Sequence, residues 1–499
     1  MTRGLLVAGT TSDAGKSLVT AGLCRWLARS GVSVAPFKAQ NMSNNSMVCP
    51  DGAEIGRAQW LQAVACGVPP EAAMNPVLLK PGSDRRSHVV LLGRPWGELE
   101  AGEWATGRRA LAAAAFAAFG DLSSRYDVVI AEGAGSPAEI NLREGDYVNM
   151  GLARAVDLPV VVVGDIDRGG VLAAMYGTLA LLSAEDQAHV RGWVVNKFRG
   201  DLDLLRPGLT MLEERTRRPV LGVLPFLPDV WLDSEDALAL AGWREAARST
   251  DEPPGSGTLD VAVVRLPRIS NATDVDALAA EPGVRVHLTA DPLVVEGADL
   301  AVLPGSRATL SDLAWLRSRR IDAALAARAA GSRPVLGICG GYQMLARDLV
   351  DDLGVEAPTP QWRSGLGLLP TTVRFHRDKR LGTPTGSWCG EVVTAYEIHH
   401  GVAAWRDPNG ARPFLDGLED GVVYGTTWHG AFENDGFRRA FLARVAAAAG
   451  SSWTPAPGAP GFAQRREAML DRLADAVEEH LDTAALLAMV DGPGSTVPS

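Results

Sequence analysis

Short apolar runs alternate with longer stretches of helical spacing along most of the chain. In the first half the apolar runs lie at 5–8, 34–37, 128–131, 160–163, 193–195 and 220–223. In the second half they lie at 261–264, 284–288, 300–303 and 335–338, with further strand-like stretches near 392–398 and 422–426. Continuous apolar strands separated by helices are typical of a parallel sheet covered by helices. The pattern therefore predicts two α/β domains.

Two polar, proline-containing stretches divide the chain. Residues 249–257 combine Ser, Asp, Pro and Gly, a composition typical of a linker. A second break near 454–460 precedes one amphipathic helical pattern over 463–489. The role of that helix stays open; if it is a species-specific extension, its deletion should spare activity. The expected parts are, in order, a first α/β domain at 1–248, a linker at 249–258, a second α/β domain at 259–445, and a segment of linker, helix and tail at 446–499.

Composition narrows the class of protein. A 499-residue chain with 46% hydrophobic residues has enough apolar material for two or three domains of a globular protein. The net charge of −11 argues against nucleic acid as a partner, because binding phosphates along a strand needs a basic face. The alanine-rich stretch at 110–119 is too short to span a bilayer and predicts an ordinary helix. Because the first strand begins near residue 4, no signal peptide is expected, and we predict a cytoplasmic protein with reduced thiols on its five cysteines.

A phosphate-binding loop opens the first domain. Residues 4–17 form a short apolar strand, a glycine-bounded loop and a Lys-Ser pair that begins a helix over 18–29. In such a loop, backbone N–H groups bind phosphates, the lysine reaches the terminal phosphates and the serine hydroxyl ligates magnesium. The alternative is a plain Gly-Lys-Ser turn. The residues expected to bind ATP are Gly9, Thr10, Gly15, Lys16 and Ser17, with Ser17 also on Mg²⁺.

The spacing of this loop departs from the common pattern. Gly9 lies one residue further from Gly15 than usual, and Thr10 occupies the expected glycine position. The stretched loop resembles that of the dethiobiotin-synthetase-like branch of phosphate-binding folds.

Polar residues follow three further strands of the first domain, where a parallel sheet presents its ligand-binding edge. Glu132 is the expected second ligand of Mg²⁺, with a solvated loop glutamate as the alternative. Asp165 ends the next strand. Asn196 ends another and is a candidate to read a purine base. Recognition of guanine needs Asp two residues after Lys197, and Arg199 stands there, so adenine is favoured.

Cys339 carries the strongest signal of the second domain. It follows the buried run 335–338 and is flanked by glycines, including Gly337 and Gly341. This pattern predicts a nucleophile elbow, in which a strand delivers the thiol to a sharp turn and the next helix points its N–H groups at the sulfur. A core cysteine on a strand is the alternative. Three glycines within five residues weigh against it, because a packed strand gains nothing from them.

The thiol needs a base and an oxyanion hole. His429 follows a strand and precedes a glycine, which suits an accessible imidazole, and His399 is the second candidate. A buried structural histidine is the alternative for either. Gly305 also follows a strand, and its N–H together with that of Gly340 is expected to bind the oxyanion of a tetrahedral intermediate. A Cys-His pair of this kind suits hydrolysis of a small amide.

Taken together, these motifs resemble the cobyric acid synthase family of glutamine-dependent amidotransferases over residues 3–440. The resemblance implies an ATP-binding amidoligase domain at 1–248 with a dethiobiotin-synthetase-like phosphate-loop fold, followed by a class I glutamine amidotransferase-like α/β domain at 259–445. It also implies that Cys339 is the glutaminase nucleophile, that His429 is its base, and that Asp146 helps to position substrate, magnesium or the intermediate. An ordinary exposed Asp is the alternative for Asp146. Related glutaminases carry a Glu two residues beyond the His, where this chain has Ala431, so the residue that orients His429 is unidentified. Apart from the Cys339 and His429 segments, the motifs that carry the resemblance are 38–46, 132–141, 146–150, 196–201, 265–271 and 303–307.

The resemblance implies a reaction. The family amidates the b, d, e and g carboxylates of adenosylcobyrinic acid a,c-diamide with ATP, Mg²⁺ and glutamine, giving adenosylcobyric acid in cobalamin biosynthesis. The partners implied are therefore a corrinoid, ATP and glutamine, with no nucleic acid and no membrane. Residues 41–121 are the expected place of substrate contacts. The order of amidation, the route of ammonia and a homo-oligomeric state stay open.

Two alternatives are weighed against this interpretation. One is a sister amidoligase, such as cobyrinic acid a,c-diamide synthase or an amidase of a cell-wall precursor. The other is a partition-type ATPase switch, whose signature lysine would stand at Thr11. The acidic charge and the glutaminase motif both argue against the switch.

Overall fold

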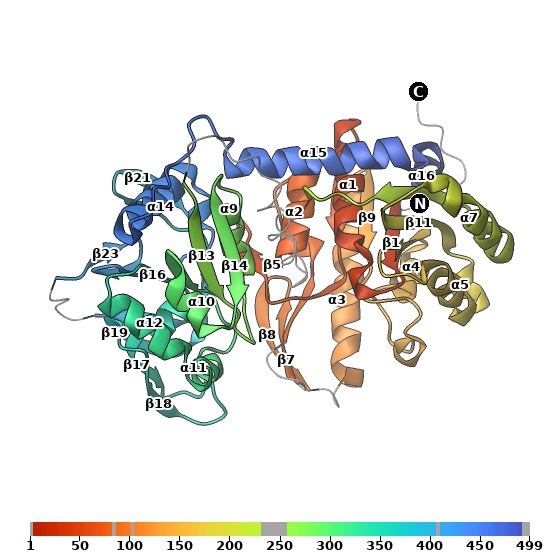
Figure 1. Cartoon of the computed structure of the whole chain (residues 1–499). Helices are drawn as coiled ribbons and strands as arrows, with labels where there is room; N and C mark the ends of the chain where they lie inside the picture. Colours follow the sequence, from red (N-terminus) through yellow and green to blue (C-terminus); the bar gives the residue numbers. More distant parts are fainter. Residues whose placement is uncertain (1–2, 82–85, 101–103, 231–256, 406–409, 492–499) are drawn as a thin grey trace. The chain divides into compact units, whose positions relative to one another are not determined.

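The computed structural model describes residues 3–81, 86–100, 104–230, 257–405 and 410–491 (Figure 1). They form two compact units. The first comprises Met1–Ser43, Cys49–Val230 and Arg466–Ser499, and the second comprises Asn44–Val48 and Trp231–Arg465. The linker predicted at 249–258 lies outside the described residues except for its last two positions. Among the described residues, no helix combines the length and the apolarity needed to cross a membrane.

The first unit is built on a six-stranded parallel sheet in the order β12-β11-β10-β1-β9-β2. Four of its strands are buried along their whole length, as their continuous apolar runs predict. The six predicted strands are thereby confirmed. Their bounds are β1 (Gly4–Gly9), β2 (Val34–Phe37), β9 (Val128–Glu132), β10 (Val160–Asp165), β11 (Val190–Phe198) and β12 (Val220–Pro225).

Helices and a small second sheet complete this unit. The predicted helix over 18–29 begins two residues earlier, at Lys16, because Gly15 adopts the left-handed conformation that starts it. The alanine-rich stretch at 110–119 lies inside α3 and is an ordinary helix, as predicted. The sheet β3-β6-β7-β8 consists of β3 (Gln40–Met42), β6 (Val77–Pro81), β7 (Arg86–Leu91) and β8 (Arg94–Glu100). The main helices are α1 (Lys16–Arg29), α2 (Arg57–Cys66), α3 (Trp104–Arg125), α4 (Met150–Val156), α5 (Val171–Leu181) and α7 (Leu202–Thr216).

The C-terminal segment forms two helices, α15 (Phe462–His480) and α16 (Thr483–Asp491), so the prediction of one continuous helical pattern over 463–489 is wrong at residues 481–482. The helix breaks because the backbone of Leu481 pairs with Gly222, and the N–H of Asp482 donates to the carbonyl of Leu221 over 2.7 Å. Bonds to the edge strand thus replace helical bonds at this point. Gly222 is required here, since a Cβ built on it would lie 2.0 Å from the carbonyl oxygen of His480.

Helix α15 packs against α1, the helix that follows the phosphate-binding loop (Figure 1). Gly22 permits the close approach, because a Cβ on it would lie 3.0 Å from the carbonyl oxygen of Leu473. Arg25 Nε donates to Asp471 over 2.8 Å, and Arg29 donates to Asp475 over 2.6 Å. Leu470 is fully buried. The residues of α15 from Arg466 onward are therefore an integral part of the first unit.

The second unit contains a seven-stranded sheet in the order β14-β13-β15-β16-β25-β24-β23. Its first five strands are parallel and include the runs predicted from the sequence, whereas β24 and β23 add to the edge in antiparallel fashion. The strands are β13 (Leu259–Val264), β14 (Val284–Thr289), β15 (Leu300–Leu303), β16 (Val335–Ile338), β23 (Arg412–Phe414), β24 (Gly417–Asp420) and β25 (Val423–Thr426). Together the two parallel sheets confirm the α/β fold class.

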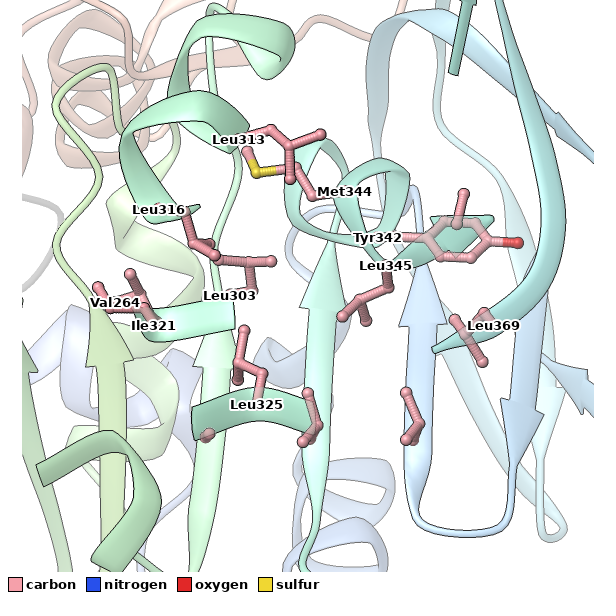
Figure 2. Close-up of a cluster of buried hydrophobic side chains, with 14 of the residues drawn as sticks. Val264, Leu303, Leu313, Leu316, Ile321, Leu325, Tyr342, Met344, Leu345 and Leu369 are labelled. Carbon is pink, nitrogen blue, oxygen red and sulfur yellow. The ribbon is translucent and has the colours of Figure 1, made fainter. Parts of the chain in front are cut away.

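Helices cover this sheet around one hydrophobic core. Leu303 from β15, Leu316 from α11 and Leu345 from α13 meet there with neighbouring aliphatic side chains (Figure 2). The helices are α9 (Asp276–Ala279), α10 (Pro292–Gly297), α11 (Thr309–Ser318), α12 (Ile321–Ala330), α13 (Gly340–Leu345) and α14 (Asp435–Ala449). The strand-like stretch near 392–398 divides between β21 (Glu391–Thr394) and β22 (Glu397–Ala404), which lie in different sheets.

Replacing Leu470 with Ala should destabilise the first unit. Removing a fully buried leucine leaves a cavity under α15, which costs about 3 kcal/mol of unfolding free energy. Urea unfolding of the full chain would show the loss as a lower midpoint. The exposed Glu479 on the same helix is the matched control, and its change to Ala should cost less than about 0.5 kcal/mol. Equal midpoints for the leucine variant and the parent would contradict the packing described.

Candidate active site

Cys339 occupies the turn between β16 and α13. Its backbone lies at φ 50° and ψ −107°, a strained conformation for a residue with a side chain. Its N–H donates to the carbonyl of Thr426 over 2.7 Å, which fixes the turn to the end of β25. Gly341 is needed beside it, since a Cβ there would lie 1.8 Å from the carbonyl oxygen of Leu303. The strand–turn–helix geometry predicted for Cys339 is confirmed.

The loop after β15 lies against this turn. A Cβ built on Gly340 would lie 2.7 Å from the backbone nitrogen of Ser306, and one on Gly305 would lie 3.2 Å from Cε1 of His429. The structure therefore brings both predicted oxyanion residues to the elbow and to the imidazole. Two backbone N–H groups from separate loops are the usual construction of an oxyanion hole.

His429 is held by Asp274, a residue that the sequence analysis missed. Its Nδ1 lies 2.6 Å from Asp274 Oδ2, and the N–H of Gly430 donates to Oδ1 over 2.9 Å. Both side chains are buried, and the ring of Tyr396 stacks on His429 at a centroid distance of 5.3 Å. Asp274 lies on the short helix η4 (Ala272–Val275), shortly after the 265–271 motif. Asp274 is therefore a candidate for the residue that orients His429, because Ala431 stands where related glutaminases carry a Glu.

The charge of Asp274 decides the protonation of the imidazole. Burial lowers the pKa of His429, but the Asp274 carboxylate and Cys339 outweigh it and raise that pKa to about 10. At neutral pH the ring is therefore an imidazolium. A protonated imidazole stabilises a neighbouring thiolate, which is the nucleophilic form of cysteine.

His399, the second candidate for the base, has other partners. Its Nδ1 lies 2.8 Å from the carbonyl of Gly401 and its Nε2 lies 3.3 Å from Glu397 Oε2. Both ring nitrogens thus bind within β22. The neighbouring carbonyl of Ile398 lies 3.9 Å from Cys339 Sγ, so β22 lines the nucleophile through its backbone.

The phosphate-binding loop of the first unit wraps the side chain of Lys16. Its Nζ donates to the carbonyls of Thr11 (2.8 Å), Ser12 (3.1 Å) and Gly135 (3.1 Å). A Cβ on Gly9 would lie 3.0 Å from Lys16 Cδ, and Thr10 bonds through its N–H to β10. The loop residues predicted for ATP therefore surround one lysine at the carboxyl edge of the sheet.

Glu132 ends β9 as a fully buried carboxylate, so the alternative of a solvated loop glutamate is wrong. Ser17 Oγ donates to Oε1 over 2.8 Å, Lys38 Nζ donates to the same oxygen over 2.7 Å, and Gln62 Nε2 donates to Oε2 over 2.6 Å. Burial raises the pKa of Glu132, but the charge of Lys38 and these hydrogen bonds lower it below its usual range. An ionised carboxylate beside a serine hydroxyl is an oxygen set that suits Mg²⁺.

Lys38 and Gln62 were not predicted as site residues. Lys38 comes directly after β2, which is the signal that could have identified it. Gln62 lies within α2, and its pattern gives no such signal.

Asn196 supports the phosphate-binding loop. Its Nδ2 donates to the carbonyl of Ala14 over 2.9 Å, and its Oδ1 accepts the N–H of Lys197. Lys197 Nζ in turn binds Asp165 Oδ2 over 2.8 Å and the carbonyl of Asp13. These bonds show how the ends of β10 and β11 hold the loop; reading of a purine by Asn196 stays a prediction.

Asp146 builds the next loop. Its Oδ1 accepts the N–H groups of Val148 and Asn149, and its Oδ2 accepts that of Gly151 over 2.8 Å. Asn149 Nδ2 then donates to the carbonyl of Ala134 over 2.7 Å. Asp146 therefore fixes the loop that contacts the segment after β9; its role in positioning substrate, magnesium or the intermediate stays a prediction.

Known families and relatives match both units. The family model described as the CobQ/CobB/MinD/ParA nucleotide binding domain matches residues 5–239, and that of the CobB/CobQ-like glutamine amidotransferase domain matches residues 260–437. A cobyric acid synthase of Mycolicibacterium gilvum is 60% identical, covering 99% of this chain and 98% of the relative. One of Cutibacterium acnes is 59% identical over 98% of this chain and 99% of the relative. With such identity over nearly the full length of both proteins, this chain belongs to the cobyric acid synthase family.

Proposed function

We propose that this chain amidates the b, d, e and g carboxylates of adenosylcobyrinic acid a,c-diamide, using glutamine as the nitrogen donor and ATP with Mg²⁺ to activate each carboxylate. The observation that carries the proposal is the Cys339–His429–Asp274 arrangement in a chain that also holds the phosphate-binding loop around Lys16. The near-full-length similarity to cobyric acid synthases supports the choice of substrate.

The glutaminase half acts by nucleophilic catalysis. The Cys339 thiolate attacks the side-chain carbonyl of glutamine, and the N–H groups of Gly305 and Gly340 stabilise the oxyanion. The C–N bond breaks as the His429 imidazolium donates a proton to the leaving nitrogen, which releases ammonia and leaves a thioester. His429, now neutral, takes a proton from water as the water attacks the thioester, and glutamate is released. Asp274 holds the ring in one orientation throughout.

The nucleotide half activates the acceptor. The backbone of the loop and Lys16 would hold the phosphates, and Ser17 with Glu132 would hold Mg²⁺, which neutralises phosphate charge when bound. A carboxylate is a poor acyl donor, so transfer of the terminal phosphoryl group to the substrate carboxylate gives an acyl phosphate that ammonia can attack. Each amide formed then consumes one ATP and one glutamine.

The direct test is mass spectrometry of the corrinoid after incubation with the protein, ATP, Mg²⁺ and glutamine. Each conversion of a carboxylic acid to a carboxamide lowers the mass by about one unit, because NH₂ replaces OH, and four successive losses are expected. A corrinoid whose mass never changes while glutamine is hydrolysed would contradict the proposed substrate.

Asp274→Asn should impair the glutaminase without unfolding the site. The amide keeps the size of the side chain but removes the charge that raises the pKa of His429, so the imidazolium is lost at lower pH. We expect kcat for glutamine hydrolysis to fall by about 10² or more, with the alkaline limb of the pH profile moved to lower pH. The exposed Asp378 offers the control, and its change to Asn should leave the profile in place. An unshifted alkaline limb in the Asp274 variant would contradict the assigned role.

Glu132→Gln should weaken binding of a fluorescent ATP analogue by about tenfold in the presence of Mg²⁺, because a neutral amide is a poor Mg²⁺ ligand. The increase in analogue affinity that Mg²⁺ gives should also become smaller. Glutaminase activity should persist. Ser17→Ala tests the same site without leaving the buried Lys38 unpaired, and the exposed Glu144→Gln is the control. If Mg²⁺ still enhances binding fully in both site variants, these residues do not hold the metal.

A further inference from the structure

The loop after β9 exposes large apolar side chains. Ile140 and Leu142, on the short helix η3 (Ile140–Leu142), are 54% and 49% exposed, and Met42 at the end of β3 is 54% exposed. Single exposed apolar residues need no explanation. Here two such residues lie within three positions of one loop, at the edge of a parallel sheet where ligands bind.

The loop that carries Ile140 and Leu142 begins at the phosphate site. The carbonyl of Gly135 accepts a bond from Lys16 Nζ over 3.1 Å, so the segment leaves the phosphate-binding lysine and reaches η3 five residues later. Gly133 fits there because a Cβ on it would lie 2.1 Å from Asn149 Oδ1. The first part of the loop is thus tightly fixed.

The far end of the loop is fixed as well. Arg143, the residue after η3, donates to both carboxylate oxygens of the buried Asp186, over 2.6 Å and 2.7 Å. The exposed apolar pair therefore lies between two anchored points, which makes it a pre-organised surface rather than a stretch that rearranges freely.

The segment with Met42 joins the same edge of the sheet. Strands β2 and β9 are parallel neighbours, with Phe37 opposite Ala131. The segments that follow these two strands therefore start side by side. The hydroxyl of Tyr147 donates to Gln40 Oε1 over 2.5 Å, which ties the two segments together. Met42 lies two residues beyond Gln40.

The reaction requires the substrate at this place. A carboxylate that accepts the terminal phosphoryl group must approach the phosphates held by Lys16, and the rest of the substrate must extend over the adjoining surface. A corrinoid is a wide macrocycle with methyl-bearing, largely apolar faces and carboxylates at its rim. It therefore matches an apolar surface that begins beside a phosphate-binding lysine.

Resting on the proposed function, we propose that Ile140 and Leu142, together with Met42, form the apolar surface that binds the corrinoid macrocycle. The bonds of the Gly135 carbonyl to Lys16 and of the Arg143 side chain to Asp186 hold this surface in place. Lys16 marks where the reacting carboxylate lies. The surface recognises the body of the substrate, which stays the same through successive amidations, rather than any one carboxylate.

The test is equilibrium dialysis of adenosylcobyrinic acid a,c-diamide, with binding measured from the absorbance of the corrinoid. The full chain is compared with the double variant Ile140→Ser, Leu142→Ser. Losing two apolar contacts should weaken corrinoid binding by about tenfold or more. Binding of the ATP analogue and hydrolysis of glutamine should stay within about twofold of the parent. Met at both positions keeps an apolar surface and should retain corrinoid affinity. Leu204→Ser is the matched control, because Leu204 is an even more exposed leucine, on α7 of the same unit.

Unchanged corrinoid affinity in the double serine variant would overturn the proposal. A parallel loss of corrinoid and ATP-analogue binding would also overturn it, since the side chains would then support the loop instead of the ligand. If the parent protein itself fails to bind the corrinoid while hydrolysing glutamine, the proposed substrate fails first, and the two failures are thereby told apart.

Discussion

Parallel strand pairing brings the carboxyl ends of neighbouring strands to one edge of a sheet, and both candidate sites depend on that constraint. In the first unit β1, β9 and β10 deliver Lys16, Glu132 and Asp165 to the edge where the phosphate-binding loop lies. In the second unit β15, β16 and β25 deliver the residues around Gly305, Cys339 and His429. In the proposed function, this arrangement serves activation of a carboxylate in one unit and release of ammonia in the other.

A buried carboxylate sets the charge of each site. Glu132 remains ionised because Lys38, Gln62 and Ser17 compensate its burial, and Asp274 keeps His429 protonated. A buried charge without a partner costs several kcal/mol of folding free energy. Removing one member of either pair would leave the other as such a charge, so each pair also stabilises the fold around it. The partners of Glu132 include the serine expected to meet magnesium, and the partner of Asp274 meets the nucleophile. Chemistry and local stability are therefore coupled at both places.

Much of the fold follows from local sequence, and the limits of that approach are physical. Continuous apolar runs identify the parallel strands, and the glycines around Cys339 identify the elbow, because both signals lie within a few residues. Asp274 could not be found this way, since it meets His429 at a sequence separation of 155 and no spacing rule links them. The break at Leu481 was likewise missed, because it depends on pairing with Gly222 rather than on helix propensity. Contacts between distant segments decide these features.

In the proposed function the two units divide the work, since Cys339 supplies ammonia and the nucleotide site forms the amide. The most direct measurement is amide formation on the corrinoid by a Cys339→Ala variant, with ATP and Mg²⁺, supplied either with glutamine or with an ammonium salt. We expect no product with glutamine and restored amidation with ammonium, because free ammonia replaces the missing thiol chemistry. Amidation that persists with glutamine, or that ammonium does not restore in a folded variant that still binds ATP, would contradict it.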